Sequence, residues 1–410
     1  MISSTTRAGA LPSVRSSLRR LLCLLLGSLF FAMSLAAGWS ASAAQEAFAD
    51  NARSAPVGER LMTANDNLYG GIEIGAKGVK AIALQVSPLE DGYYEVESRM
   101  PIKDKNTTIM AGVKETGRFA AEAIKETAQA VNEFFKEIRD TFKVPVEHIY
   151  IAGSSGLQAN NKDELAAAIE KLIGKKMIFL DTQSEVEYSI LGIIARQHRR
   201  TGILIDIGSG NTKGGYREGA PEAPRFVTMS IPFGTVTFTN ELYANGASDT
   251  EAAGRADALC QKLVTAPLRQ QIDRKPGLIN RKRAYLTGGI VWTMATLLHP
   301  ANRRALVRIT ASDINEFAAR VRKDAQSLLN PDLSTIKIAA ARQQAEQDVQ
   351  KIRDTFTPRN LLAGAEILKA FSSEFNFAAK YVYFARYGQI GWLLSYVETQ
   401  AREELENEVK

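Results

Sequence analysis

The sequence predicts an α/β protein of two related lobes, and three observations support this class. Short apolar strands alternate with segments of helical apolar spacing from about Leu68 onward. A series of three strands followed by helices occurs twice along the chain. Each series contains a strand that ends in a carboxylate and runs into a glycine-rich turn. Such self-similarity indicates two lobes built from the same kind of unit.

The first series covers the lobe expected at 68–181. Gly75 and Asp91-Gly92 separate its first strands because glycine and aspartate favour turns. The expected elements are strands at 69–74, 79–86 and 93–97, a helix at 111–142, a strand at 148–152, a helix at 162–173 and a strand at 177–180.

The second series covers the lobe expected at 182–404, including the C-terminal helices. It opens with a helix at 183–197 and then repeats the order of the first series. The expected elements are strands at 202–207, 212–216 and 225–230, helices at 236–242 and 250–268, a strand at 283–286, and helices throughout 312–409.

Composition limits the classes of function. The 410 residues include 51 basic and 45 acidic side chains, and the net charge of +6 only mildly favours an anionic partner. Nothing in this balance predicts binding to nucleic acid. The three histidines (His148, His198 and His299) show no metal-site spacing, so neither a zinc site nor a histidine-based nucleophile is expected.

The N-terminus has the layout of a secretory signal peptide. Arginines precede an apolar run at 21–37, and Ala41-Ser42-Ala43 then offers small residues for cleavage. We therefore expect residues 1–43 to be a signal peptide and 44–67 to be a linker, which predicts an exported, periplasmic protein. The alternative is an uncleaved anchor, because about 18 apolar residues just span a bilayer.

Two hairpins carry the residues most suited to chemistry. The first runs from Glu73 through Gly75, Ala76, Lys77 and Gly78, and the second from Asp206 through Gly208, Ser209, Gly210, Asn211, Thr212 and Lys213. Glycine lets the backbone bring N–H groups close to an anion, and a carboxylate before the turn can hold a metal ion. One such hairpin alone would favour an ordinary turn, whereas two at matching places in two repeats favour phosphate binding.

This arrangement resembles the superfamily of actin, heat-shock chaperone ATPases and sugar kinases. More closely, it resembles the Ppx/GppA family of exopolyphosphatases and guanosine pentaphosphate phosphohydrolases, over about 68–397. The matching segments are 73–78, 149–158, 184–192, 205–212, 233–236, 362–368 and 391–396. The resemblance implies an actin-like ATPase fold of two RNase H-like lobes, with a cleft between the lobes that clamps phosphates.

The resemblance also assigns roles within the cleft. Glu185, at the start of a predicted helix, would activate the water that attacks the terminal phosphorus, although an ordinary N-terminal helix charge is the alternative. Asp206 and Glu73 would hold Mg²⁺ or another divalent cation, and the two glycine turns would bind phosphate. Ser154 and Ser155 either extend the phosphate site or form a plain loop. Thr287-Gly288-Gly289 offers a further anion site or a packing turn.

Three departures from the family pattern concern the substrate and the metal. The family's Ser-Asn-Ser is Ala76-Lys77-Gly78 here, its second-loop glutamate is Lys213, and its arginine after the long helix is Gln158. A lysine in place of a carboxylate weakens a divalent metal site, but it can place an ammonium on a phosphate.

Two main functions follow, and a third stays open. The first is hydrolysis of terminal phosphate from polyphosphate or a related phosphoanhydride. The second is a degenerate envelope protein that binds an anion or a partner in the cleft. The third is a cytosolic filament or ATPase with a membrane anchor. The tail at 377–410 is expected to cap the first lobe or to form a homodimer contact.

Overall fold

The computed structural model describes residues 67–88, 94–220 and 223–408. The predicted signal segment at 1–43 lies outside the described residues, as does the predicted linker at 44–67 apart from Asn67. Among the helices in the described ranges, none is long and apolar enough to cross a membrane.

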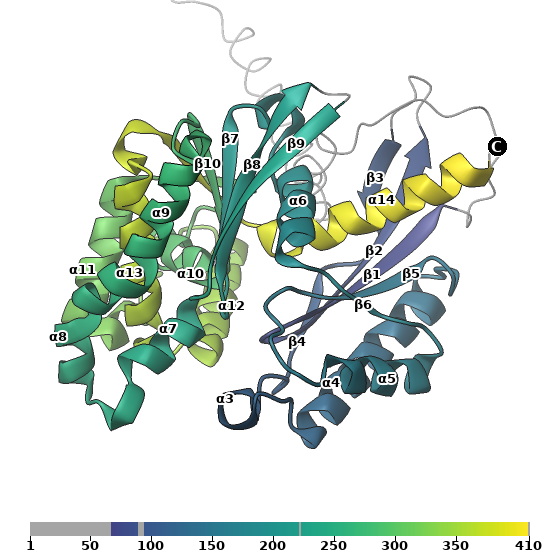
Figure 1. Cartoon of the computed structure of the whole chain (residues 1–410), viewed down its shortest axis with the longest axis horizontal. Helices are drawn as coiled ribbons and strands as arrows, with labels where there is room; N and C mark the ends of the chain where they lie inside the picture. The colour runs from purple at the N-terminus through teal and green to yellow at the C-terminus, as the bar shows by residue number, and fades with distance from the viewer. Residues whose placement is uncertain (1–66, 89–93, 221–222, 409–410) are drawn as a thin grey trace, which may run out of the picture. The chain divides into compact units, whose positions relative to one another are not determined.

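The first sheet joins an antiparallel meander to a parallel extension (Figure 1). β1 is antiparallel to β2 and parallel to β5, so it occupies the centre of the sheet. Apart from Glu73, its eight residues are apolar, aromatic or small, and nearly all are buried, as expected for a strand covered on both faces. The order across the sheet is β3 (Tyr94–Ser98), β2 (Gly78–Pro88), β1 (Leu68–Gly75), β5 (Ile149–Gly153) and β6 (Ile178–Phe179), and β4 (Lys103–Asn106) also pairs with β2.

The second sheet repeats this plan. β7 is the central strand, antiparallel to β8 and parallel to β10. The order is β11 (Leu306–Ile309), β12 (Tyr381–Ala385), β10 (Arg283–Thr287), β7 (Gly202–Ile207), β8 (Thr212–Ala220) and β9 (Ala223–Ile231). The prediction of two related lobes is confirmed by this shared order of a three-strand meander followed by parallel strands.

Helices of the first lobe differ from the expected single helix at 111–142. A short α3 (Val113–Thr116) ends at Gly117, whose φ of +72° is left-handed, and α4 (Ala121–Lys136) then starts a new helix that ends in a π-helical turn at Glu137–Thr141. The expectation of one continuous helix was wrong because this glycine stops it. α5 (Lys162–Ile173) packs beside α4.

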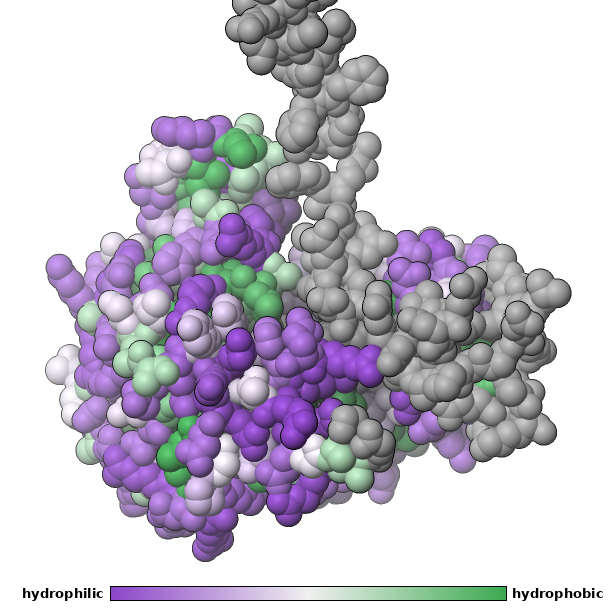
Figure 2. All heavy atoms as spheres, turned by 90° about the horizontal axis from the view of Figure 1, so that it is seen from above, coloured by the Kyte–Doolittle hydropathy of each residue, from purple (hydrophilic) through white to green (hydrophobic). Residues whose placement is uncertain are grey.

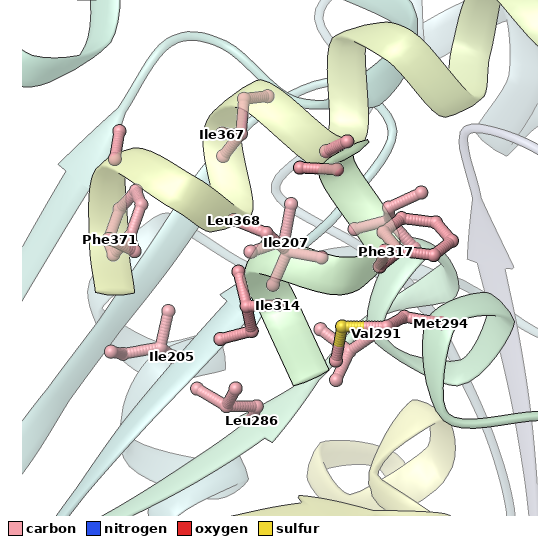
Figure 3. Close-up of a cluster of buried hydrophobic side chains, with 14 of the residues drawn as sticks. Ile205, Ile207, Leu286, Val291, Met294, Ile314, Phe317, Ile367, Leu368 and Phe371 are labelled. Carbon is pink, nitrogen blue, oxygen red and sulfur yellow. The ribbon is translucent and has the colours of Figure 1, made fainter. Parts of the chain in front are cut away.

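The largest core lies under the second sheet. Ile205 and Ile207 of β7 point toward Phe317 and Phe371 from two helices, as Figure 3 shows. All four side chains are fully buried, so this core anchors β7 and the turn that follows it. The helices of this lobe are α7 (Thr235–Leu242), α8 (Asp249–Cys260), α9 (Ala266–Arg274), α10 (Gly289–Leu298), α11 (Ala311–Leu328), α12 (Ala339–Thr355) and α13 (Pro358–Glu374).

The C-terminal region departs from the all-helical expectation for 312–409. Residues Tyr381–Ala385 form β12, which inserts between β10 and β11. The last helix, α14 (Gly391–Glu408), then crosses to the first lobe, where it lies against β1 and packs along α6 (Thr182–Ile193) (Figure 1). Of the two roles expected for the tail, capping of the first lobe is confirmed.

The face seen in Figure 2 is dominated by hydrophilic side chains, with hydrophobic ones in small separate groups. Scattered exposed apolar residues are normal on a folded protein. The described part of this face therefore carries no extended apolar patch.

Candidate active site

The first glycine-rich hairpin joins β1 to β2. Gly75 pairs with Gly78 across the turn, which leaves Ala76 and Lys77 at its tip. A Cβ on Gly78 would lie 2.1 Å from the carbonyl oxygen of Lys105 in β4, so only glycine lets these strands pair so closely. The amide groups at the tip donate to no acceptor among the described residues, and they are available to an anion.

The second hairpin joins β7 to β8 and is fastened from behind by α7. The carbonyl oxygen of Gly208 accepts a hydrogen bond from Thr235 N at 3.0 Å, and that of Ser209 accepts one from Val236 N at 2.9 Å. Gly234 starts this contact, and a Cβ there would lie 2.4 Å from the Gly208 carbonyl oxygen. Since these carbonyls point toward α7 and the peptide bonds are trans, the N–H groups of Ser209 and Gly210 face the opposite way.

Both hairpins border one cavity of about 200 Å³. A water molecule occupies about 30 Å³ of liquid, so the cavity has room for a group several times that size. The second hairpin also lies close to the first lobe, since a Cβ on Gly210 would lie 3.4 Å from the carbonyl oxygen of Gly156 in the loop after β5. The two turns therefore border the same cavity between the lobes, as the sequence predicted.

Glu185 reaches the cavity from the first turn of α6. Asp181 caps this helix by accepting a hydrogen bond from Ser184 N at 2.7 Å, which fixes where the helix begins. The Glu185 side chain is 3% exposed; its Oε2 accepts from Ser155 N at 2.7 Å, and its Oε1 lies 3.0 Å from Lys213 Nζ. The carboxylate is thus held in one orientation at the wall of the cavity.

Lys213 lies at the centre of the charges. Its ammonium is 3.0 Å from Glu185 and 3.2 Å from Asp206, and its side chain is 6% exposed. Burial alone would lower the pKa of Lys213, but the two carboxylates outweigh it and raise that pKa, so the ammonium stays charged. Burial likewise opposes ionisation of Glu185, yet Lys213 and the hydrogen bonds of Ser155 hold the pKa of Glu185 below its usual value.

The first hairpin contains the same kind of pair. Lys80 Nζ donates to Glu73 Oε1 at 3.1 Å, and the other oxygen, Oε2, is buried and has no hydrogen-bond partner among the residues that the structure describes. Burial raises the pKa of Glu73, an effect that Lys80 opposes and Glu185 reinforces. In both hairpins the lysine stands directly opposite the carboxylate in the strand register, seven positions later in the sequence.

The carboxylates expected to bind Mg²⁺ do not fit that role in this arrangement. Mg²⁺ demands oxygen ligands at about 2.0–2.1 Å in octahedral geometry. Asp206 already contacts the Lys213 ammonium, and Glu73 contacts that of Lys80. No group of three or more potential metal-binding His, Cys, Asp or Glu side chains occurs in the described ranges. A divalent ion would have to displace an ammonium that the strand register holds in place.

Most residues predicted for the site line the cavity. Ser155 and Thr212 do not: Ser155 contributes its N–H to Glu185, and the Thr212 hydroxyl donates to the carbonyl oxygen of Phe233 at 2.8 Å. The predicted residues on the cavity wall are Glu73, Gly75, Ala76, Lys77, Gly78, Ser154, Glu185, Asp206, Gly208, Ser209, Gly210, Asn211 and Lys213.

Sequence reasoning missed several lining residues. Lys80 could have been found, because its spacing from Glu73 equals that of Lys213 from Asp206. No sequence pattern pointed to Phe356 or Trp392 as cavity residues. Phe356 lies between α12 and α13 and Trp392 lies in α14, both far along the chain from the two hairpins. Gly288 and Gly289, at the start of α10, were expected to form an anion site or a packing turn; both border the cavity, and Gly288 adopts a φ of +102°.

Comparison with known proteins agrees with this architecture. A profile described as the Ppx/GppA phosphatase family matches residues 99–331, more than half of the chain. This chain belongs to the Ppx/GppA phosphatase family. Membership indicates a phosphatase-type function, and the family resemblance drawn from the hairpin motifs is confirmed. No match was found among curated proteins.

Solved structures of Ppx/GppA proteins share the fold. An exopolyphosphatase-like protein is 16% identical with a TM-score of 0.60, covering 82% of this chain and 99% of its own. The Ppx/GppA family member of Aquifex aeolicus is 18% identical with a TM-score of 0.57, covering 82% and 98%. An exopolyphosphatase from Cytophaga hutchinsonii is 13% identical with a TM-score of 0.56, covering 81% and 98%. The chain thus has the two-lobed actin-like ATPase fold with a helical C-terminal segment.

Proposed function

We propose that this Ppx/GppA protein hydrolyses the terminal phosphoanhydride bond of a linear polyphosphate or a related phosphoanhydride. The observation that carries the proposal is the meeting of two glycine turns, from separate lobes, at one cavity whose wall includes the buried carboxylate of Glu185. Free amide N–H groups and lysine ammoniums of this cavity suit the oxygen atoms of phosphate.

In this mechanism the hairpins hold the terminal phosphate while Glu185 orients a water molecule. The water oxygen forms a bond to the terminal phosphorus, and the bond from phosphorus to the bridging oxygen breaks. The shortened chain leaves with that electron pair, and Glu185 accepts the proton of the water. Phosphoryl transfer depends chiefly on positioning and charge stabilisation, so an ionised carboxylate of lowered pKa suffices to orient water.

The test is phosphate release by the purified full-length protein. We expect Glu185→Gln to lower the rate by about 10²- to 10⁴-fold, the usual contribution of a general base. Glu187→Gln is the matched control, because it makes the same change on the same helix at a residue outside the cavity. Equal rates for wild type and Glu185→Gln would remove Glu185 from the mechanism.

One observation favours a second function, a non-catalytic envelope protein that binds an anion or partner in the cleft. Lys213 contacts Glu185, on which hydrolysis would depend, and also Asp206, which a catalytic metal ion would need. Absence of phosphate release from polyphosphates and nucleotides, together with retained binding, would select this function.

We also propose export to the periplasm, on the basis of the N-terminal residues 1–43. The alternative is retention at the membrane by the same segment. Cell fractionation and N-terminal sequencing of the mature chain distinguish the two, since a cleaved protein would begin after Ala43 and be released with the soluble envelope fraction.

A further inference from the structure

The charges around the cavity are arranged as pairs that the β-hairpins themselves supply. Glu73 faces Lys80 and Asp206 faces Lys213, in each case directly across an antiparallel pair of strands. Side chains opposed in this way have Cβ atoms about 4.5–5.5 Å apart, so each ammonium stays close to its carboxylate. Glu185, from α6, contacts the second pair through Lys213.

Lys213 thus stands where two carboxylates from different elements converge. Its nitrogen is within hydrogen-bonding distance of Glu185 Oε1 and Asp206 Oδ2, and 3.5 Å from Asn211 Oδ1 in the turn. These are the hard oxygen donors that a divalent cation would otherwise collect. The ammonium supplies a positive charge between them without needing a metal ion.

We propose that Lys213 is the built-in cation of this cleft, and that the site binds a phosphate chain free of divalent metal. The ammonium would neutralise Glu185 and Asp206, and a phosphate oxygen held by the second hairpin would replace Asn211 Oδ1, whose 3.5 Å contact is the longest of its three. Lys80 does the same for Glu73 in the first hairpin. This inference rests on the proposed function in one respect, that phosphate binds at the glycine-rich hairpins of the cavity. It concerns binding of the phosphate chain and not cleavage of its bonds.

The overall charge of the cavity wall agrees with this inference. Five lysines and four carboxylates line the wall, and Lys105 also pairs with Glu133 outside it, so positive and negative charges on the wall nearly balance when all of these groups are ionised. A metal-binding cleft would instead carry excess negative charge before the ion arrives. The lysines on the wall are Lys77, Lys80, Lys105, Lys213 and Lys351, and the carboxylates are Glu73, Asp104, Glu185 and Asp206.

The experiment measures binding, with inorganic tripolyphosphate and Mn²⁺ as probes. Calorimetry of the full-length protein with tripolyphosphate in EDTA should show binding. Bound Mn²⁺ is measured separately, by the decrease in the electron paramagnetic resonance signal of free Mn²⁺. The wild type should show no Mn²⁺ binding that Asp206→Asn abolishes. Lys213→Glu should weaken metal-free tripolyphosphate binding by about tenfold or more, the usual effect of losing a charge-assisted hydrogen bond. The same variant should gain a Mn²⁺ site. Lys323→Glu, at an exposed position of α11, is the matched control.

Wild-type protein alone decides the question if Lys213→Glu does not fold. The inference is overturned if tripolyphosphate fails to bind in EDTA, or if the wild type binds one Mn²⁺ that Asp206→Asn abolishes. Binding in EDTA without any phosphate release would refute the hydrolase while leaving this inference standing. Hydrolysis that requires a Mn²⁺ ion bound through Asp206 would support the hydrolase and refute the inference of a metal-free site.

Discussion

Removing the Lys213 ammonium should destabilise the protein strongly at neutral pH. In Lys213→Met, the carboxylate of Glu185, 3% exposed in the wild type, would keep only its hydrogen bond from Ser155. Breaking a buried ion pair from one side costs about 3–5 kcal/mol, because an uncompensated charge is left inside. Asp206 is 19% exposed and can be hydrated, so we expect the lower part of that range.

The loss should shrink on acidification. Without Lys213, burial would raise the pKa of Glu185 above its ordinary value of about 4.5. When the pKa of a carboxyl is higher in the folded than in the unfolded protein, the group stabilises the folded state fully at pH values below its pKa in the unfolded protein. This stabilisation is lost as pH rises through its pKa in the folded protein. In the wild type the pKa of Glu185 is lowered, so that contribution is instead lost as pH falls. The two proteins should therefore become more alike between pH 7.5 and pH 5.

Urea unfolding followed by tryptophan fluorescence measures this difference, because Trp292 and Trp392 both border the cavity. Lys323→Met controls for loss of a surface lysine. The double variant Lys213→Met with Glu185→Gln should recover part of the loss, since the amide carries no charge. A loss below about 1 kcal/mol at pH 7.5, or an equal loss at pH 5, would refute the argument from a buried charge.

Three further outcomes are expected. Burial lowers the pKa of Lys77 to about 8, so affinity for tripolyphosphate, measured by calorimetry in EDTA, should fall as pH rises from 7 to 9. Lys77→Arg should abolish this pH dependence, and a variant whose affinity falls as steeply as that of the wild type would count against a role of Lys77. A Cβ on Gly192 would lie 2.0 Å from a carbonyl oxygen of α14, so Gly192→Ala should lower the free energy of unfolding in urea by about 1–3 kcal/mol or more. Gly254→Ala, in open space on α8, is the control and should raise that free energy by up to about 1 kcal/mol. Glu366 is 1% exposed and pairs with Arg322 at 2.8 Å. Arg322→Met should cost about 3 kcal/mol by the same measurement, the low end for breaking a buried pair, because Lys369 Nζ still lies 3.6 Å from Glu366; a negligible change would show that the pair is not structural.

Much of the fold and most of the candidate site could be predicted from sequence, because the responsible contacts are local. The alternation of strands and helices and its repetition identified two lobes, and each phosphate turn lies within one hairpin of adjacent strands. The break at Gly117 was missed since the apolar spacing continues on both sides of it. β12 was missed because Tyr381–Ala385 is too short and apolar to be separated from a buried helix by periodicity.

The sequence by itself determined which groups each hairpin carries: a carboxylate, a glycine turn and a lysine seven positions after the carboxylate. The pairing of the two strands of a hairpin places that lysine opposite the carboxylate, and both strands are adjacent in the sequence. Only the tertiary structure decided what that chemistry faces. It placed Glu185 against Lys213, brought Phe356 and Trp392 to the cavity, and laid α14 on a sheet whose central strand is more than 300 residues earlier. Those contacts arise from burial of apolar surface between distant segments, which depends on shape and not on sequence separation.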